Sequence, residues 1–169
     1  MPKEQHSEIS LLDIRIGRII SIDNHPDADS LYIEQVDVGE SEPRTIVSGL
    51  VKFCSKEQLL NRLVVVVCNL KPRKLKGVLS QGMLLCASDQ DHTKVEPVLP
   101  PDTAHIGEPV TFEGHLSAPV EAGNKATKAF GQIVSKLCVN SHGVATYDGI
   151  SFKTSQGECM SSILDGRIS

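Results

Sequence analysis

The sequence predicts a mainly β fold, in which a five-stranded barrel carries a small α+β C-terminal subdomain packed on it. Short runs rich in Val, Ile and Leu, separated by turn residues, recur up to residue 113. One short helical segment lies among them, and a longer helical pattern appears only after residue 124. Because closure removes exposed strand edges, five strands with one sealing helix are most economically arranged as a barrel.

Composition limits the class of protein. The chain has 169 residues, of which 40% are hydrophobic, so we expect a packed core in one domain or two small ones. Aromatic residues make up only 4%, which argues against an extensive base-stacking platform. The net charge of −4 excludes a generally basic nucleic-acid binder, so any phosphate binding must be local and salt-sensitive.

The cysteine spacing and the lack of long apolar stretches indicate the cellular compartment. Five cysteines occur with no CxxC pair, which is typical of neither a disulfide framework nor a zinc ribbon. A reducing, cytoplasmic environment is therefore expected. No stretch is long and apolar enough to span a bilayer, so we expect no membrane association. The polar residues 1–9 are expected to be disordered.

The chain begins with a long strand and a turn. Asp13–Ile22 predicts a strand with a bulge at Gly17. Asn24–Ser30 is turn-forming by its chemistry. Its two aspartates and His25 raise the alternative of a metal site, but the ligand spacing of a calcium loop is missing and a structured turn is favoured.

The elements that follow complete a barrel at residues 10–113. We expect strands at Leu31–Val38, Arg44–Ser48, Leu63–Cys68, Met83–Ala87, Val95–Val98 and Val110–Phe112, a turn at Gly39–Pro43 and a helix at Lys56–Leu60. The continuous β-branched run at residues 63–68 should be buried on both faces. This order of elements is that of the oligonucleotide-binding (OB) barrel.

A basic stretch, residues 69–83, organises the middle of the chain. It reads NLKPRKLKGVLSQGM and holds the cations Lys71, Arg73, Lys74 and Lys76 without a carboxylate. We interpret it as a basic loop between two strands, whose cations meet phosphates while Ser80 and Gln81 add neutral hydrogen bonds. The alternative is a solvated loop that protects a strand edge from aggregation.

The C-terminal subdomain is expected at residues 114–169, after a linker at Gly114–Asn124. Lys125–Leu137 predicts an amphipathic helix, and Val144–Phe152 a hairpin with Asp148-Gly149 at its turn. Residues 89–121 contain seven acidic residues and one lysine, so we expect one positively and one negatively charged region on the molecular surface. No catalytic motif occurs, so we expect neither an enzyme nor a cofactor or metal site.

The residues resemble one known family. DIRIGRIISIDNHPDADSLY, DVGESEPRTIVSGLV and CNLKPRKLKGVLSQGM, in this order, resemble the endothelial monocyte-activating polypeptide II-like tRNA-binding domain, and the likeness extends into VATYDGISFK. The resemblance implies an OB barrel whose C-terminal annex mimics the dimer interface of bacterial relatives, giving a monomer. It implies tRNA as partner, together with a methionyl-, tyrosyl- or lysyl-tRNA synthetase in cis or in trans.

The resemblance also implies where tRNA is bound. Matching positions are Asn69, Lys71, Arg73, Lys76, Ser80, Gln81 and Met83, with Lys74 in the same stretch and Arg44 and Ser48 as weaker candidates. Barrel packing is the alternative role for Gln81 and Met83. Family members with strong binding often carry a Lys-rich segment near the annex, whereas residues 124–136 here hold only three lysines. Weak binding remains useful when a linked synthetase supplies a high effective concentration.

Two other functions stay open at this point. Arg15–Ser21 is similar to a heptapeptide implicated in the cytokine-like activity of some animal relatives, which makes a released signalling polypeptide one alternative. The simpler interpretation of this segment is the first barrel strand. The acidic residues between 89 and 121 point to a protein–protein scaffold in a multisynthetase complex as the other alternative.

Overall fold

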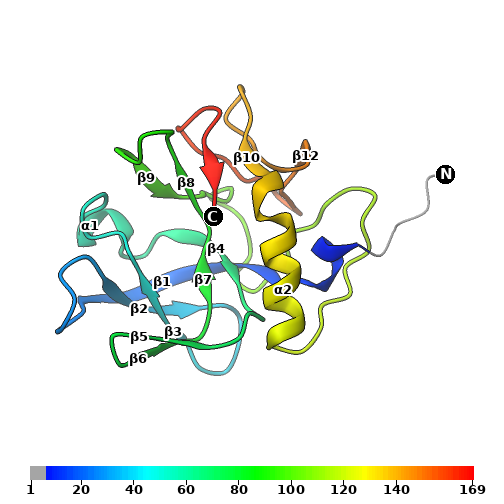
Figure 1. The fold of residues 1–169 in the computed structure, drawn as a ribbon. Coiled ribbons are helices and arrows are strands. Elements are labelled where there is room, and N and C mark those ends of the chain that lie inside the picture. Colours follow the sequence, from blue (N-terminus) through cyan, green and yellow to red (C-terminus); the bar gives the residue numbers. More distant parts are fainter. Residues whose placement is uncertain (1–6) are drawn as a thin grey trace.

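A computed structural model describes residues 7–169 and confirms the predicted mainly β fold (Figure 1). Five antiparallel strands form the barrel sheet in the order β3-β2-β1-β4-β7. These strands are β1 (Ile14–Asn24), β2 (Tyr32–Asp37), β3 (Arg44–Ser48), β4 (Leu63–Val67) and β7 (Met83–Leu84). β1 pairs with β2 on one side and with β4 on the other, so the longest strand is the central strand of the barrel sheet.

One feature of β1 differs from its sequence-based prediction. The predicted bulge at Gly17 was wrong, because the register shifts between Ile19 and Ser21 and leaves the side chain of Ile20 45% exposed. Gly17 has another role, since a Cβ atom at this position would lie 2.9 Å from Cγ1 of Val36. The glycine therefore allows β1 and β2 to approach closely.

The barrel closes between β3 and the chain just before β7. The backbone N–H of Gln81 donates to the carbonyl oxygen of Thr45 at 2.7 Å, and the N–H of Thr45 donates to Gln81 Oε1 at 3.0 Å. The N–H of Val47 donates to the Ser80 hydroxyl at 3.0 Å. Side-chain hydrogen bonds thus satisfy backbone groups that would otherwise form an open sheet edge.

A second, six-stranded sheet joins both halves of the chain in the order β12-β11-β10-β15-β8-β9. Its strands are β8 (Cys86–Ser88), β9 (Val95–Pro97), β10 (Leu137–Val139), β11 (Ala145–Tyr147), β12 (Ile150–Ser151) and β15 (Arg167–Ile168), while β13 (Lys153–Thr154) pairs with β14 (Gly157–Glu158). The single strand expected at Met83–Ala87 was wrong, because the chain leaves the barrel after β7 and enters this sheet as β8. The strand expected at Val110–Phe112 is replaced by an isolated bridge between Thr111 and Lys153.

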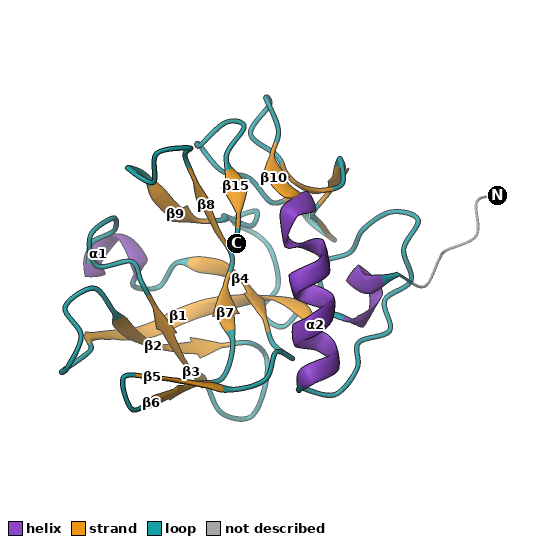
Figure 2. Ribbon diagram, in the orientation of Figure 1, coloured by secondary structure: helices purple, strands orange, loops and turns teal. Residues whose placement is uncertain are grey.

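The helices are short and lie outside the barrel sheet (Figure 2). Helix α1 (Lys56–Leu59) begins with a capping box, in which the Ser55 hydroxyl accepts from the N–H of Gln58. Helix α2 (Asn124–Ile133) continues into the 3₁₀ turn η2 (Val134–Lys136) and buries one face.

The N-terminal stretch only partly falls within the structure. Of the residues expected to be disordered, 1–6 lie outside the described residues. The structure differs from the expectation at the end of this stretch, because η1 (Glu8–Leu11) is a 3₁₀ turn whose Ile9 is buried in the core. An apolar side chain that packs against the core orders its own segment.

Two clusters of buried side chains form the core. One fills the barrel and includes Val64 and Val66, whereas the other lies between the barrel and the C-terminal half and includes Val65 and Val67. Alternate valines of β4 therefore serve different clusters, which confirms the predicted burial of this strand on both faces. Within the part of the chain that the structure describes, no helix is long and apolar enough to cross a membrane.

Candidate nucleic-acid interface

The basic stretch folds as a β-hairpin of its own. β5 (Arg73–Leu75) pairs with β6 (Val78–Ser80), and Leu75 lies opposite Val78. Lys76 and Gly77 between them have φ angles of 49° and 86°, as a type I′ turn requires at both central residues. The interpretation as a loop was therefore wrong, because the Lys-Gly pair turns the chain tightly enough for its flanks to pair. We call residues 71–80 the basic hairpin.

The cations of the basic hairpin are open to solvent. Lys71, Arg73, Lys74 and Lys76 are all exposed. Between residues 7 and 169, the ion pairs within 4 Å use other cations, namely Arg15, Arg44 and Arg62. The hairpin lies at the lower edge of Figure 1, away from β8 and β9, where the acidic stretch begins. Unpaired cations on a sheet scaffold are suited to bind phosphate groups.

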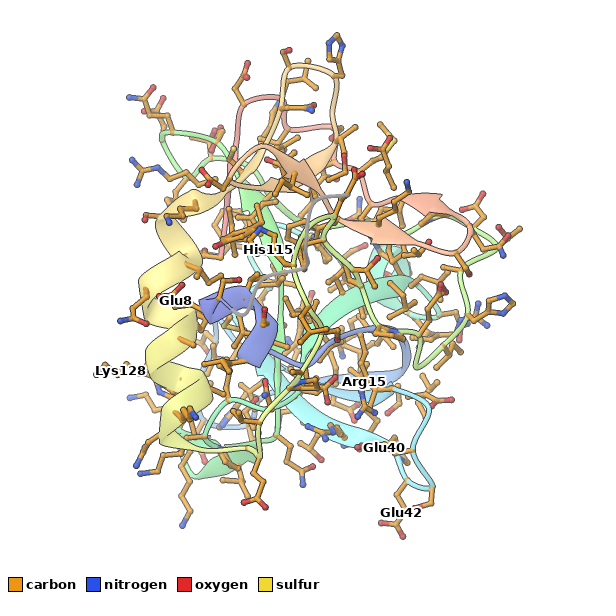
Figure 3. The ribbon with its side chains drawn as sticks, turned by 90° about the vertical axis from the view of Figure 1, so that its right-hand side faces the viewer. Glu8, Arg15, Glu40, Glu42, His115 and Lys128 are labelled. Carbon is orange, nitrogen blue, oxygen red and sulfur yellow. The ribbon has the colours of Figure 1, made fainter. Side chains whose placement is uncertain are left out.

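The base of the basic hairpin is joined to helix α2. The N–H of Lys71 donates to Oγ1 of Thr127 at 2.9 Å, and Leu70 forms a bridge with Gly123 just before the helix. α2 buries Ala126, Ala129 and Ile133 and exposes its lysines. Figure 3 shows one of them, Lys128, directed away from the body of the molecule.

Lys125 and Lys128 of α2 thereby extend the positive surface, with no acidic residue in α2 or η2. Sequence reasoning counted these lysines but did not place them beside the hairpin. The contact joins residues 56 positions apart, and no local pattern in the sequence signals it.

Two of the candidate residues are buried and serve the scaffold. Asn69 is 4% exposed: its Oδ1 accepts from the N–H of Asp13 at 2.9 Å, and its Nδ2 donates to the carbonyl oxygens of Leu11 and Val120 at 2.8 and 2.9 Å. Ser80 is 6% exposed, and besides accepting from β3 it donates to a backbone carbonyl. Ser80 thus holds the end of the basic hairpin against β3, and Asn69 fixes the chain just before the hairpin to the segments that contain Leu11, Asp13 and Val120.

Gln81 and Met83 lie where the chain returns to the barrel. Gln81 is exposed, although its backbone N–H and Oε1 are both bonded to Thr45. Met83 is half-buried at the start of β7 and packs against the core. The two residues thus take part in barrel packing, and Gln81 also presents its side chain at the surface next to the hairpin.

Arg44 and Ser48 are committed to partners within the protein. Nε and Nη2 of Arg44 donate to the Glu40 carboxylate at 2.7 and 2.8 Å, and its Nη1 donates to the carbonyl oxygens of Cys68 and Gln81. These bonds from Arg44 lower the pKa of Glu40, and Glu40 in turn raises the pKa of Arg44. The Ser48 hydroxyl donates to Oε2 of the buried Glu34 at 2.8 Å. The charge of Arg44 is therefore neutralised locally, unlike those of the hairpin.

A cavity of about 450 Å³ lies beside the base of the hairpin, between the β2–β3 turn, Pro72 and Ala122. Its wall includes Arg44, four of whose five N–H groups already donate within the protein, and the acidic residues Glu40 and Glu42. Figure 3 shows Arg15 near Glu40, which it approaches to 3.7 Å. Acidic side chains repel phosphate, so the exposed hairpin is the better candidate for an anionic ligand than this cavity.

The segment Arg15–Ser21 is part of the barrel. It lies within β1, where Ile16 and Ile19 are fully buried. Arg15 donates two hydrogen bonds to the Asp13 carboxylate, at 2.9 and 2.8 Å. A receptor would have to open the barrel to contact Ile16 or Ile19, so the structure favours the interpretation of this segment as a strand.

Comparison with known proteins places the chain in a family. Residues 14–109 match the family described as "Putative tRNA binding domain". The chain belongs to this tRNA-binding domain family. Over 95% of its length, the chain is similar to the solved C-terminal domain of Plasmodium vivax p43, with a TM-score of 0.85 and 34% identity, and the match covers 98% of that chain.

Curated relatives of the tRNA-binding domain are longer proteins. It is 48% identical over 158 residues to the cytoplasmic methionine–tRNA ligase of Arabidopsis thaliana, which covers 93% of this chain and 20% of the relative. It is 48% identical over 153 residues to the aminoacyl tRNA synthase complex-interacting multifunctional protein 1 of Mus musculus, which covers 90% of this chain and 49% of the relative. The tRNA-binding domain thus spans between a fifth and a half of these relatives' length.

Proposed function

We propose that this chain is a non-sequence-specific tRNA-binding auxiliary domain that increases tRNA capture by an aminoacyl-tRNA synthetase, to which it is linked or with which it associates. The observation that carries the proposal is the basic hairpin, which presents four exposed cations without an ion-pair partner among the described residues. Phosphate contacts position a nucleic acid but carry no sequence information. Recognition is therefore of the folded shape of the tRNA rather than of its bases.

The candidate residues divide into two roles. Lys71, Arg73, Lys74 and Lys76 contact phosphates, Gln81 adds a neutral hydrogen bond, and the half-buried Met83 lines the edge of the contact. Asn69, Ser80 and Arg44 hold the chain at the hairpin and at the closure of the barrel through the hydrogen bonds described above, whereas Ser48 bonds to Glu34 of the neighbouring strand β2. The lysines of α2 extend the contact, so one tRNA touches both the barrel and the C-terminal half.

The setting follows from the relatives. One is named as a cytoplasmic methionine–tRNA ligase and another as a synthase complex-interacting protein, so we place this non-catalytic domain in the cytoplasm beside a synthetase. With few lysines in the annex and a net charge of −4, the domain alone binds weakly. Linkage to a synthetase raises the effective concentration into the millimolar range, at which weak binding suffices.

Fluorescence anisotropy of labelled tRNA at several salt concentrations tests the proposal on the isolated chain. Two tRNAs of different identity should bind with dissociation constants within about threefold of each other, because phosphate contacts dominate. The logarithm of the affinity should fall against the logarithm of salt with a slope of about −3 to −5, as four to six phosphate contacts require. Absence of a complex in dilute buffer, or binding restricted to one tRNA, would overturn the proposal.

A further inference from the structure

The turn between β1 and β2 contains a buried histidine to which phosphate binding assigns no role. His25 is 4% exposed, and its backbone N–H donates to the carbonyl oxygen of Leu31 at 3.0 Å. Its Nδ1 accepts from the N–H of Asp27 at 3.0 Å, and its Nε2 lies 3.0 Å from the carbonyl oxygen of Leu75. The ring therefore bridges its own turn and the basic hairpin, across 50 residues of sequence.

The two contacts determine the tautomer of His25. A ring nitrogen that accepts from a backbone N–H carries no proton, so in the neutral ring the proton is on Nε2. Nε2 then donates to the carbonyl oxygen of Leu75. Both nitrogens are used within the protein, so the ring offers no free lone pair to a metal ion. The structured turn predicted at Asn24–Ser30 is confirmed, and His25 is the part of it that reaches the hairpin.

The contact with His25 lies near the tip of the basic hairpin. Leu75 is the last residue of β5, next to the Lys76-Gly77 turn. The other end of the hairpin is held separately. The N–H of Lys71 donates to Thr127 of α2, and the hydroxyl of Ser80 accepts from the N–H of Val47 in β3. A two-stranded hairpin outside the barrel sheet is marginally stable alone, so a bond near its tip limits its movement.

We propose that His25 is a positioning residue for RNA binding, which fixes the tip of the basic hairpin through the carbonyl oxygen of Leu75. The inference rests on the proposed function. Cations held in place before the RNA arrives cost less conformational entropy on binding than cations on a mobile tip. The positions of Lys74 and Lys76, on either side of Leu75, depend most on this contact.

Two substitutions at position 25 distinguish the hydrogen bond to Leu75, which we call the tether, from the hydrogen bond to Asp27 within the turn. His25→Asn places an amide oxygen near the position of Nδ1, so an acceptor for the N–H of Asp27 remains. The shorter side chain does not extend to the carbonyl oxygen of Leu75, so that hydrogen bond is lost. His25→Gln places an amide N–H near Nε2, which keeps the donor to Leu75 and loses the bond to Asp27. We expect His25→Asn to weaken tRNA binding by about three- to tenfold and His25→Gln to stay within about twofold of wild type.

A second readout does not depend on RNA. In the free protein, amide hydrogen exchange across residues 74–79 should be faster in His25→Asn and unchanged in His25→Gln, because only the first loses the tether. Thermal unfolding of both variants shows whether the barrel is intact. This measurement also keeps the inference testable if one variant binds poorly for reasons of overall stability.

The remaining outcomes are equally informative. Equal weakening in both variants, or unchanged binding in both, would overturn the positioning role, as would weakening by His25→Gln alone. If the wild-type chain forms no salt-sensitive complex with tRNA, the proposed function fails, whereas the exchange of the hairpin amides still reports on the tether. If the wild type binds and His25→Asn leaves both binding and exchange unchanged, only the inference about His25 fails.

Discussion

Replacing Lys71, Arg73 and Lys76 by alanine is expected to lower the affinity for tRNA by about 100-fold in dilute buffer. Each charge-assisted phosphate contact from an exposed side chain contributes on the order of 1 kcal/mol, and three of them correspond to about two decades in the dissociation constant. All three side chains are exposed, so the free energy of unfolding should change by less than about 0.5 kcal/mol. Anisotropy titrations and urea unfolding measure the two quantities.

A charge-matched control separates the hairpin from the net charge of the domain. Lys52, Lys94 and Lys153 are also exposed, and they lie outside the hairpin and α2. Alanine at these three positions changes the net charge from −4 to −7 (−4 − 3), as the hairpin substitutions do. We expect this control variant to bind tRNA within about threefold of wild type, since direct phosphate contacts, and not charges elsewhere on the surface, supply most of the binding free energy. Similar losses in both variants would show that overall charge, and not the hairpin, determines binding.

Stability is expected to fall as pH rises from about 5 to 8, because of one buried carboxyl group in the barrel. Glu34 of β2 has no exposed surface, and its Oε1 has no hydrogen-bond partner among residues 7–169. Burial raises the pKa of Glu34 to about 8, and the hydrogen bond from Ser48 only partly offsets this. The side chain is therefore mostly neutral in the folded protein at pH 7.

The sign follows from proton linkage. The folded pKa of Glu34, about 8, lies above its ordinary value of 4.5, so the folded protein binds the proton more tightly than the unfolded chain. Between these two values the free energy of unfolding decreases as pH rises, by a total on the order of a few kcal/mol, and above pH 8 the loss levels off.

Urea unfolding of wild type and Glu34→Gln across this pH range is the test. Gln cannot titrate, so the difference between the two proteins isolates Glu34 from all other groups. We expect wild type to lose stability relative to the variant between pH 5 and 8. Parallel pH profiles for the two proteins would show that Glu34 titrates as an ordinary exposed carboxyl group.

The barrel could be predicted from sequence because its strands carry strong local signals. The β-branched run of β4 and the alternating isoleucines of β1 both mark buried strands. The hairpin β5–β6 was missed because each strand has only three residues, and two of the three in β5 are cations, which are poor strand signals. The exit of the chain after Leu84 depends on pairing with β15, far away in sequence, and no local pattern encodes it.

The candidate site was only partly predictable for the same reason. The exposed cations follow directly from the composition of the stretch, whereas Asn69 and Ser80 look like surface polar residues until their backbone partners are known. In β2, sequence alternation alone does not show which face is inside. The closed barrel turns Tyr32, Glu34 and Val36 inward and thereby buries a carboxyl group that a sequence pattern would place at the surface.

Acetylation of lysines with and without tRNA, read by mass spectrometry, tests most directly whether the basic hairpin and α2 form the RNA-binding surface. The account predicts that tRNA slows the modification of Lys71, Lys74, Lys76, Lys125 and Lys128, while Lys52, Lys94 and Lys153 react as fast as in the free protein. Protection of the second group, or equal protection of all lysines, would contradict it.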